Sequence, residues 1–219
     1  MRTMFINCDG IDGSGKSTVL LHLAEKFRKE GKYVELTREP GGTVLAEEIR
    51  SLTLAHREEH VAEMTELLLM YAARCQNVEG IIKPALLQNK IVITDRFSTS
   101  TVAYQSFGRG IPLEKVYALE KMVLNGFKPD LTFIMDIDPV VSLERAKKRN
   151  ILDRIESEAP GFFHRAREGF LFQAKRDPRS FRVIDASRSI EEVKEQVDFE
   201  LKKYLVMINK KTYKEELLM

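Results

Sequence analysis

One short segment near the N-terminus, Gly10-Ile-Asp-Gly-Ser-Gly-Lys-Ser17, constrains the fold of this chain more than any other. It follows the apolar run Met4 to Cys8, which is typical of a buried strand, and it opens the helical apolar spacing of Ser17 to Glu30. Glycines let a backbone wrap closely around phosphates, and N–H groups at a helix N-terminus attract negative charge. This order predicts a phosphate-binding loop, or P-loop; the alternative is a glycine-rich turn without a ligand.

The side chains of this loop indicate how it would bind a nucleotide. Lys16 can reach the terminal phosphates, and the hydroxyl group of Ser17 can ligate Mg²⁺. Successive backbone N–H groups of the loop supply partial positive charge. We therefore expect the donor nucleotide to contact Gly10, Ile11, Asp12, Gly13, Ser14, Gly15, Lys16 and Ser17.

Further apolar runs alternate with helical patterns along the rest of the chain. The runs are Tyr33 to Thr37, Ile91 to Thr94, Leu131 to Met135 and Phe181 to Ile184. Helical patterns fill the intervals at Val61 to Gln88, Leu113 to Leu124, Val140 to Lys148 and Phe163 to Ala174, and Ser189 with Glu192 makes a capping box before a last helix. Strands separated by helices imply right-handed crossovers and a parallel sheet covered on both faces. We expect one α/β domain over residues 1–219, with a five-stranded parallel sheet in a three-layer P-loop NTPase fold.

Three segments depart from these regular patterns. Pro84 predicts a kink or a restart within the long helical pattern. Residues 149–161 are charged and end in Pro160-Gly161, which is typical of a mobile lid. The tail, residues 209–219, is amphipathic at best, and we assign it no function.

The overall composition limits the classes of partner. Thirty-five Lys and Arg residues oppose 33 Asp and Glu residues, and the formal charge of +2 argues against a general binder of nucleic acid or of membrane surfaces. The longest apolar run, Leu67 to Ala73, is too short to span a bilayer, and the N-terminus lacks a signal-peptide pattern. Cys8 and Cys75 form neither a C-x-x-C pair nor half of a zinc site, which indicates a reducing compartment. We expect a cytoplasmic protein.

A polar pair, Asp95 and Arg96, follows the run Ile91 to Thr94. Because ligands bind at the carboxyl ends of parallel strands, Asp95 should face the P-loop, where a carboxylate can hold Mg²⁺ through water. Arg96 can bridge anionic phosphates. A strand-end salt bridge is the alternative for this pair. Asp136 closes another strand and is a rival metal-binding carboxylate, although no arginine follows it.

Six separated motifs together indicate one family. They are the P-loop with Asp9-Gly10, Thr37-Arg38-Glu39-Pro40-Gly41-Gly42, Tyr71-Ala72-Ala73-Arg74-Cys75-Gln76, Asp95-Arg96, Ala103-Tyr104-Gln105 with Gly108-Arg109-Gly110, and Leu152-Asp153-Arg154-Ile155-Glu156. In this order they resemble the motifs of the thymidylate kinases, P-loop enzymes that phosphorylate dTMP to dTDP. The resemblance runs from Met4 to Leu205. One motif alone would indicate only a nucleotide binder.

The resemblance implies a reaction and an acceptor site. The reaction is phosphoryl transfer from ATP, with Mg²⁺, to dTMP for dTTP synthesis, and the resemblance also implies a homodimer. Asp12 resembles the carboxylate that contacts the 3′-hydroxyl group of the acceptor, and Tyr104 resembles the ring that favours deoxyribose. Arg38, Arg74 and Arg96 resemble the arginines of the monophosphate site. In the family, the arginine at position 74 hydrogen-bonds the thymine carbonyl.

Three more residues correspond to positions around the thymine base in the family. Thr101 and Gln105 hold positions near the base. Met70 stands four residues before Arg74, where the family usually stacks a phenylalanine on thymine. A thioether also packs on an aromatic face, but it is more flexible and less selective.

The resemblance also implies which side chain neutralises the negative charge of the transition state. The family places an arginine either in the P-loop or on the lid, and positions Ile11 to Ser14 carry no basic side chain. We expect Arg149 to act as an arginine finger within the chain, with Arg154 as the runner-up. The expected catalytic residues are Lys16, Asp95, Arg96, Arg149 and Arg154, and the expected metal contacts are Ser17 and Asp95. A deoxynucleoside kinase and a non-catalytic P-loop binding module are the alternatives.

Overall fold

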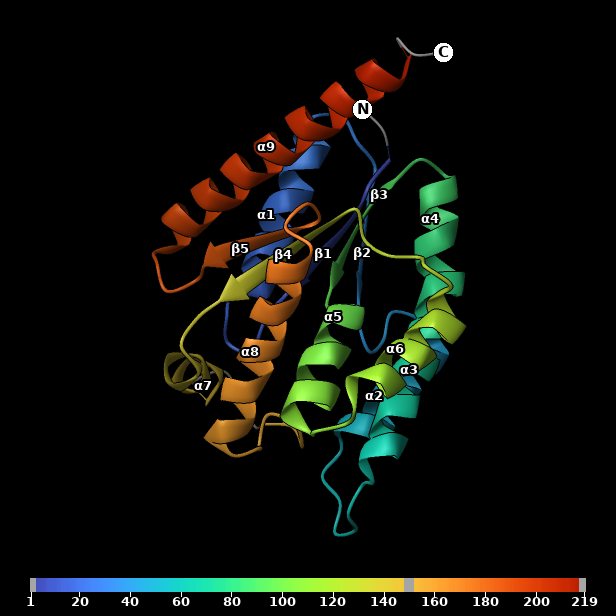
Figure 1. Cartoon of the computed structure of the whole chain (residues 1–219), viewed down its shortest axis with the longest axis vertical. Helices are drawn as coiled ribbons and strands as arrows, with labels where there is room; N and C mark the ends of the chain where they lie inside the picture. Colours follow the sequence, from blue (N-terminus) through green and yellow to red (C-terminus); the bar gives the residue numbers. More distant parts are fainter. Residues whose placement is uncertain (1–2, 148–151, 217–219) are drawn as a thin grey trace.

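A five-stranded parallel sheet forms the centre of the molecule (Figure 1). The computed structural model describes residues 3–147 and 152–216. The strands are β1 (Phe5–Asp9), β2 (Val34–Arg38), β3 (Ile91–Asp95), β4 (Leu131–Asp136) and β5 (Phe181–Asp185), in the spatial order β2-β3-β1-β4-β5. Because β1 pairs in parallel with both β3 and β4, its carboxyl end lies in the middle of the sheet edge. The predicted α/β fold and its five strands are confirmed.

Helices cover both faces of this sheet. They are α1 (Lys16–Lys29), α2 (Val44–Leu54), α3 (Glu63–Asn77), α4 (Lys83–Leu87), α5 (Ser98–Thr101), α6 (Leu113–Leu124), α7 (Pro139–Lys147), α8 (Pro160–Arg176) and α9 (Ile190–Glu216), with the π-helical segments η1 (Val78–Ile82) and η2 (Val102–Gly108). Helices α1 and α9 contact each other on one face, and α5 and α8 lie on the other (Figure 1). The result is the predicted three-layer arrangement.

Successive residues of the central strands point to opposite layers. Ile6 and Ile93 belong to a buried cluster that includes the inner side of α1, whereas Phe5 and Val92 belong to a cluster that includes η1 and α4. The rings of Phe5 and Phe97 pack edge to face with centroids 5.1 Å apart. Burial on both sides explains why these strands have continuous apolar sequences.

The helices differ from the sequence pattern in four places. Helix α2 and the α5–η2 segment fall outside the predicted helices. The helix predicted from Val61 to Gln88 is interrupted by η1, and α4 restarts with Pro84 in its first turn, where the missing N–H is tolerated. Helix α8 begins at Pro160, so the last two residues of the predicted lid at 149–161 are helical. Residues 148–151 lie outside the described residues.

Two glycines bring α8 close to η2. A Cβ atom on Gly108 would lie 2.5 Å from the ring of Phe162, and a Cβ atom on Gly169 would lie 2.9 Å from the Cα atom of Ala103. Such separations admit no side chain. Helix α8 therefore fixes the position of η2, which carries part of the predicted acceptor site.

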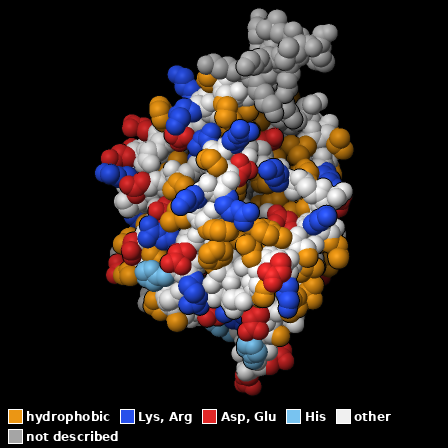
Figure 2. Space-filling view, viewed as in Figure 1, with side chains coloured by type: hydrophobic (Ala, Val, Ile, Leu, Met, Phe, Trp, Pro, Cys, Tyr) orange, Lys and Arg blue, Asp and Glu red, His pale blue; other side chains and the backbone are white. Residues whose placement is uncertain are grey.

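Charges of both signs are mixed over the face drawn in Figure 2, as the net charge of +2 leads one to expect. An apolar band crosses the middle of this face. Among the residues that the structure describes, no helix is both long enough and apolar enough to cross a membrane.

Candidate active site

The P-loop joins β1 to α1 at the carboxyl edge of the sheet. Gly13 has a left-handed φ of +86°, and a Cβ atom there would lie 2.2 Å from the carbonyl oxygen of Ser142 in α7. Glycine is therefore required both by the backbone angle and by the close approach of α7. The Nζ atom of Lys16 donates to the carbonyl oxygens of Gly10 at 3.1 Å and Ile11 at 3.0 Å. These bonds hold the ammonium group against the loop.

A polar cavity of about 150 Å³ lies beside the P-loop, and we call it the donor cavity. Its lining includes Gly13, Gly15, Lys16 and Ser17 of the loop together with Asp95 at the end of β3. Burial lowers the pKa of Lys16 below its ordinary value, and neighbouring arginine charge lowers that pKa further. An anion such as a phosphate would reverse this effect, because it favours the charged ammonium.

Asp95 has the features of a metal contact. Its Oδ1 atom is buried and makes no hydrogen bond within the described residues. A buried carboxylate oxygen without a partner is costly, and a divalent cation or its bound water would supply one. Ser17 lines the same cavity with an exposed side chain. Asp136, the rival carboxylate, instead accepts two hydrogen bonds from Arg167 at 2.7 and 2.9 Å.

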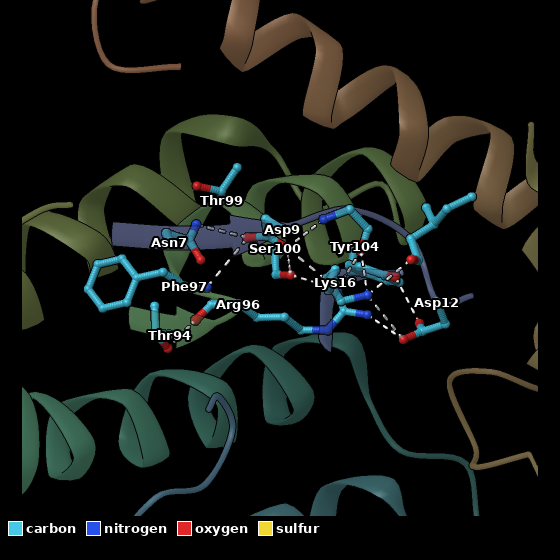
Figure 3. A network of polar contacts seen from close by, with 12 residues as sticks. Asn7, Asp9, Asp12, Lys16, Thr94, Arg96, Phe97, Thr99, Ser100 and Tyr104 are labelled. Carbon is cyan, nitrogen blue, oxygen red and sulfur yellow. Dashed lines mark hydrogen bonds and ion pairs between the residues drawn. The ribbon is translucent and has the colours of Figure 1, made fainter. Parts of the chain in front are cut away.

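Arg96 reaches from the end of β3 across to the P-loop (Figure 3). Its φ of +70° is left-handed, which costs a residue with a side chain about 1–2 kcal/mol. The Nη1 atom donates to the carbonyl oxygen of Gly10 at 2.9 Å and to Ser100 Oγ at 3.0 Å. The Nη2 atom donates to Asp12, and Asp9 lies 3.5 Å from Nη1. The guanidinium group is therefore fixed between the P-loop and α5.

A second cavity, of about 100 Å³, also contains Arg96, and we call it the acceptor cavity. Its lining includes the predicted acceptor residues Asp12, Met70, Arg74, Arg96, Thr101, Tyr104 and Gln105. Arg38 does not line this cavity. Its exposed side chain pairs with Glu47 at 2.8 Å and lines the donor cavity, and its contact with the acceptor monophosphate stays a prediction.

Arg74 is held in one orientation inside the acceptor cavity. It is 2% exposed and donates to Glu39 at 2.6 Å, to the hydroxyl group of Thr101 at 2.9 Å and to the carbonyl oxygen of Phe97 at 3.1 Å. The guanidinium carbon lies 4.8 Å from the ring centroid of Tyr71. These hydrogen bonds use only part of the five N–H donors of an arginine. The remaining donors can meet an acceptor group in the cavity.

The two cavities share several side chains. These are Asp12, Glu39, Arg50, Arg96 and Glu156. Burial alone would raise the pKa of Asp12, but Arg96 and Lys16 beside it hold that pKa below its ordinary value. The ionised carboxylate accepts a 2.9 Å hydrogen bond from the hydroxyl group of Tyr104. A group bound in one cavity would therefore face a group bound in the other across Asp12 and Arg96.

The sequence analysis assigns no role to Arg50 or Glu156, although Glu156 ends the sixth motif. Arg50 is half-buried, donates to the carbonyl oxygen of Pro40 at 2.9 Å, and comes from the unpredicted helix α2. The signal that could have revealed α2 is its N-cap, Thr43, whose hydroxyl accepts from the N–H of Ala46 at 3.2 Å. Burial raises the pKa of Glu156, and the negative charge of nearby aspartates raises it further.

The structure describes one of the two predicted lid arginines, Arg154. Arg154 lines neither cavity, because its side chain donates to the carbonyl oxygen of Thr53 at 2.9 Å and to Glu66 at 2.6 Å. Its role as a transition-state cation stays a prediction. Arg149 lies outside the described residues.

Comparisons with known proteins find relatives over most of the chain. Residues 8–197 match the family model described as Thymidylate kinase. A thymidylate kinase of Pseudomonas putida (strain GB-1) is 44% identical over 198 residues, covering 90% of this chain and 94% of the relative. One from Hahella chejuensis is 46% identical over 190 residues, covering 87% of this chain and 91% of the relative.

A solved structure supports the same relationship. The crystal structure of thymidylate kinase from Ehrlichia chaffeensis superimposes with a TM-score of 0.74 at 37% sequence identity, covering 92% of this chain and 99% of that one. The residues matched by the family model, 8–197, include the P-loop and all residues that line the acceptor cavity. The chain therefore belongs to the thymidylate kinase family.

Proposed function

We propose that the protein transfers the terminal phosphoryl group of ATP to dTMP and so supplies dTDP for dTTP synthesis. The observation that carries this proposal is the meeting of two cavities at Asp12 and Arg96. One cavity is lined by the P-loop and the other by Arg74 and Tyr104. The names of the relatives identify the acceptor as thymidylate.

The reaction needs positioning and charge neutralisation, because two anionic groups must meet in line. Lys16 neutralises the terminal phosphates of the donor. Arg96 holds the acceptor phosphate against repulsion, and Arg50, which lines both cavities, adds a second positive charge there. No general base is required, since a phosphate oxygen is already a nucleophile at neutral pH. Arg74 binds the base and so places the acceptor phosphate.

Ser17 and Asp95 would hold Mg²⁺. The fit rests on the buried, unpaired Oδ1 atom of Asp95 and on the Ser17 side chain in the same cavity. The described residues contain no group of three or more His, Cys, Asp or Glu side chains that could hold a metal. Nucleotide phosphates and water would therefore complete the coordination, which is usual for this ion. When bound, Mg²⁺ supplies positive charge to the donor phosphates.

The lid would supply the transition-state cation through Arg149. Two observations support this assignment. The P-loop positions Ile11 to Ser14 offer no basic side chain. The other lid candidate, Arg154, is already bonded to Glu66 and to the backbone of α2.

Two alternative functions fit the acceptor cavity less well. A deoxynucleoside kinase acts on a neutral hydroxyl group, which gains nothing from two arginines, Arg50 and Arg96, at the junction with the donor cavity. A P-loop module that only binds nucleotide would not need an acceptor cavity. The fixed orientation of Arg74 also favours recognition of a second, specific molecule.

The partner that we propose for this chain is a second copy of itself. Met64, Leu68, Ala72 and Cys75 follow one another along a single exposed side of α3. Helices α2 and α6 contact α3 and carry further exposed apolar residues. Exposed apolar residues on neighbouring helices are typical of a subunit interface. The free cysteines suit a reducing compartment, and we propose a cytoplasmic location.

One assay tests the function against both alternatives. The protein is incubated with Mg-ATP and, separately, with thymidine, dTMP, dUMP, UMP, CMP and AMP, and the phosphorylated products are identified. We expect dTDP from dTMP as the main product. Formation of dTMP from thymidine would favour a deoxynucleoside kinase. ATP binding without product from any acceptor would favour a binding module.

A further inference from the structure

A buried carboxylate, Glu66 on α3, lies directly behind the acceptor cavity. It is 1% exposed and does not itself line the cavity. Its Oε1 atom accepts from Gln105 Nε2 at 2.9 Å and from Arg109 Nε at 3.2 Å. Its Oε2 atom accepts from Arg109 Nη2 at 3.1 Å and from Arg154 Nη2 at 2.6 Å. One carboxylate thus joins α3, η2 and the lid.

This carboxylate is ionised at neutral pH. Burial alone would raise the pKa of Glu66, but hydrogen bonds from Arg109 and Gln105 and the charge of Arg109 hold the pKa below its ordinary value. An ionised carboxylate accepts hydrogen bonds and donates none. Any group that faces Glu66 must therefore present a donor.

The consequence falls on Gln105, whose amide has two different ends. Its NH₂ group donates and its Oε1 atom accepts, and the two ends exchange places when the amide flips. Glu66 takes the NH₂ end, and Gln105 is also part of the acceptor cavity wall. The end of the amide that is left for the cavity is then the acceptor, Oε1.

We propose that Glu66 is a positioning residue that fixes the Gln105 amide with its oxygen toward the bound base, so that the site favours a base with an N–H group at that point. This proposal rests on the proposed function. Thymine and uracil carry a hydrogen on N3, whereas N3 of cytosine is an acceptor. Glu66 would therefore favour dTMP and dUMP over dCMP without touching any of them.

The variant Glu66→Gln tests this directly, because a neutral amide of the same size can donate as well as accept. The Gln105 amide is then free to flip and to offer its NH₂ group to cytosine. We expect the ratio of kcat/KM for dTMP to that for dCMP to fall by about tenfold, the scale of one hydrogen bond made or lost. The ratio of kcat/KM for dTMP to that for dUMP should stay unchanged, since both bases have the same N3–H group.

Two controls separate positioning from simple loss of structure. Glu158→Gln removes another carboxylate that pairs with Arg109 but does not line the acceptor cavity, so the dTMP to dCMP ratio should not change. Glu66→Asp keeps an acceptor-only group and should keep the wild-type ratio. A merely structural role for Glu66 predicts that Glu66→Gln lowers both kcat/KM values by the same factor.

A double-variant cycle shows whether Glu66 acts through Gln105. Gln105→Ala should itself lower the dTMP to dCMP ratio, and adding Glu66→Gln to it should lower the ratio no further. An unchanged ratio in Gln105→Ala overturns the proposal, and this measurement stands even where Glu66→Gln fails to fold. A wild-type protein that phosphorylates no pyrimidine monophosphate would instead overturn the proposed function. Normal dTMP turnover with an unchanged ratio in Glu66→Gln overturns the positioning role alone.

Discussion

The Nε atom of Arg74 lies 2.6 Å from Oε2 of Glu39, and each of the two residues is 2% exposed. Truncating Arg74 to alanine would leave a buried carboxylate without its cation, which costs about 3–5 kcal/mol of folding stability. A loss of dTMP binding in that variant would therefore combine a folding effect with a binding effect. Arg74→Lys keeps a positive charge beside Glu39 but loses the planar fork of the guanidinium group.

We expect Arg74→Lys to raise the KM for dTMP by roughly 10- to 150-fold, the scale of a hydrogen bond to a charged group. The KM for ATP should stay nearly unchanged, because Arg74 lines only the acceptor cavity of the two. Steady-state kinetics with each substrate varied in turn measures both constants. A raised KM for ATP with a normal KM for dTMP would place Arg74 on the donor side.

Lys16→Ala should abolish phosphoryl transfer while the protein stays folded. The Nζ atom of Lys16 donates to two carbonyl oxygens of the P-loop and lies 3.8 Å from the carboxylate of Asp12 in the same loop. Its removal therefore changes contacts within the loop and leaves the packing of the sheet and helices in place. Lys26→Ala is a matched control, since Lys26 lies on the same helix and pairs with Asp198 at 3.2 Å near the surface. Turnover and thermal unfolding are measured for both. Activity of Lys16→Ala within a few-fold of wild type would reject this loop as the donor site.

The two lid arginines should behave differently. Arg149→Ala should lower kcat by roughly 10³- to 10⁵-fold with a nearly unchanged KM for dTMP, as expected of a cation that acts in the transition state. Arg154→Ala should lower the melting temperature, because Glu66 then loses one of its charged partners, and its effect on kcat should be much smaller. Near-normal kcat in both variants would reject a lid arginine as the transition-state cation.

Asp12 makes a pH-dependent contribution to stability. Its pKa is lower in the folded protein than the ordinary value of about 3.9, so the ionised form stabilises the fold above that pH, and the contribution is lost as the pH falls through the depressed pKa. We expect Asp12→Asn to lower the free energy of unfolding at pH 7 and to lower it less at pH 3. Urea unfolding of both proteins at the two pH values measures this. Equal losses at both would mean that the charge of Asp12 does not stabilise the fold.

Leu68→Glu should convert the proposed dimer to a monomer. Leu68 is 50% exposed on the apolar side of α3, and a charge there would be buried without a partner in the interface. Leu87→Glu is the control, because Leu87 is 85% exposed and lies on α4 rather than on the apolar side of α3. Light scattering after size-exclusion chromatography gives the mass of each variant. A wild-type protein that is already a monomer would contradict the proposed homodimer.

Much of the fold could be predicted because its signals are local. A strand buried on both faces needs a continuous apolar run, and the run Met4 to Cys8 differs from β1 by one residue at each end. The α5–η2 segment could not be predicted in this way. Its buried side chains include Thr99, Ser100 and Ser106, which are polar, so its burial is imposed by α8 and by the charged network around Arg96 rather than by its own pattern.

The candidate site also contains residues that could be predicted from the sequence and residues whose positions depend on distant contacts. Arg96 could be predicted from its place at the end of a buried apolar run, whereas Arg74 is predicted from the resemblance of its motif to those of the thymidylate kinases. Arg154 also stands within a motif, yet its direction is decided by Glu66, which is 88 residues away in the sequence. Arg50 depends on where α2 packs, and no local pattern reports that position.

The π-helical form of η2 places a constraint on the number of residues in this part of the chain. A π turn holds one residue more than an α turn. Deleting Val102 would shorten the path from α5 to Tyr104 and Gln105 by one residue, which changes the direction of both side chains around the helix axis relative to α5. Every cavity-lining side chain would still be encoded, but two of them would face elsewhere. A gene library that shortens this segment by one codon should therefore lose acceptor recognition more completely than one that randomises any single position within it.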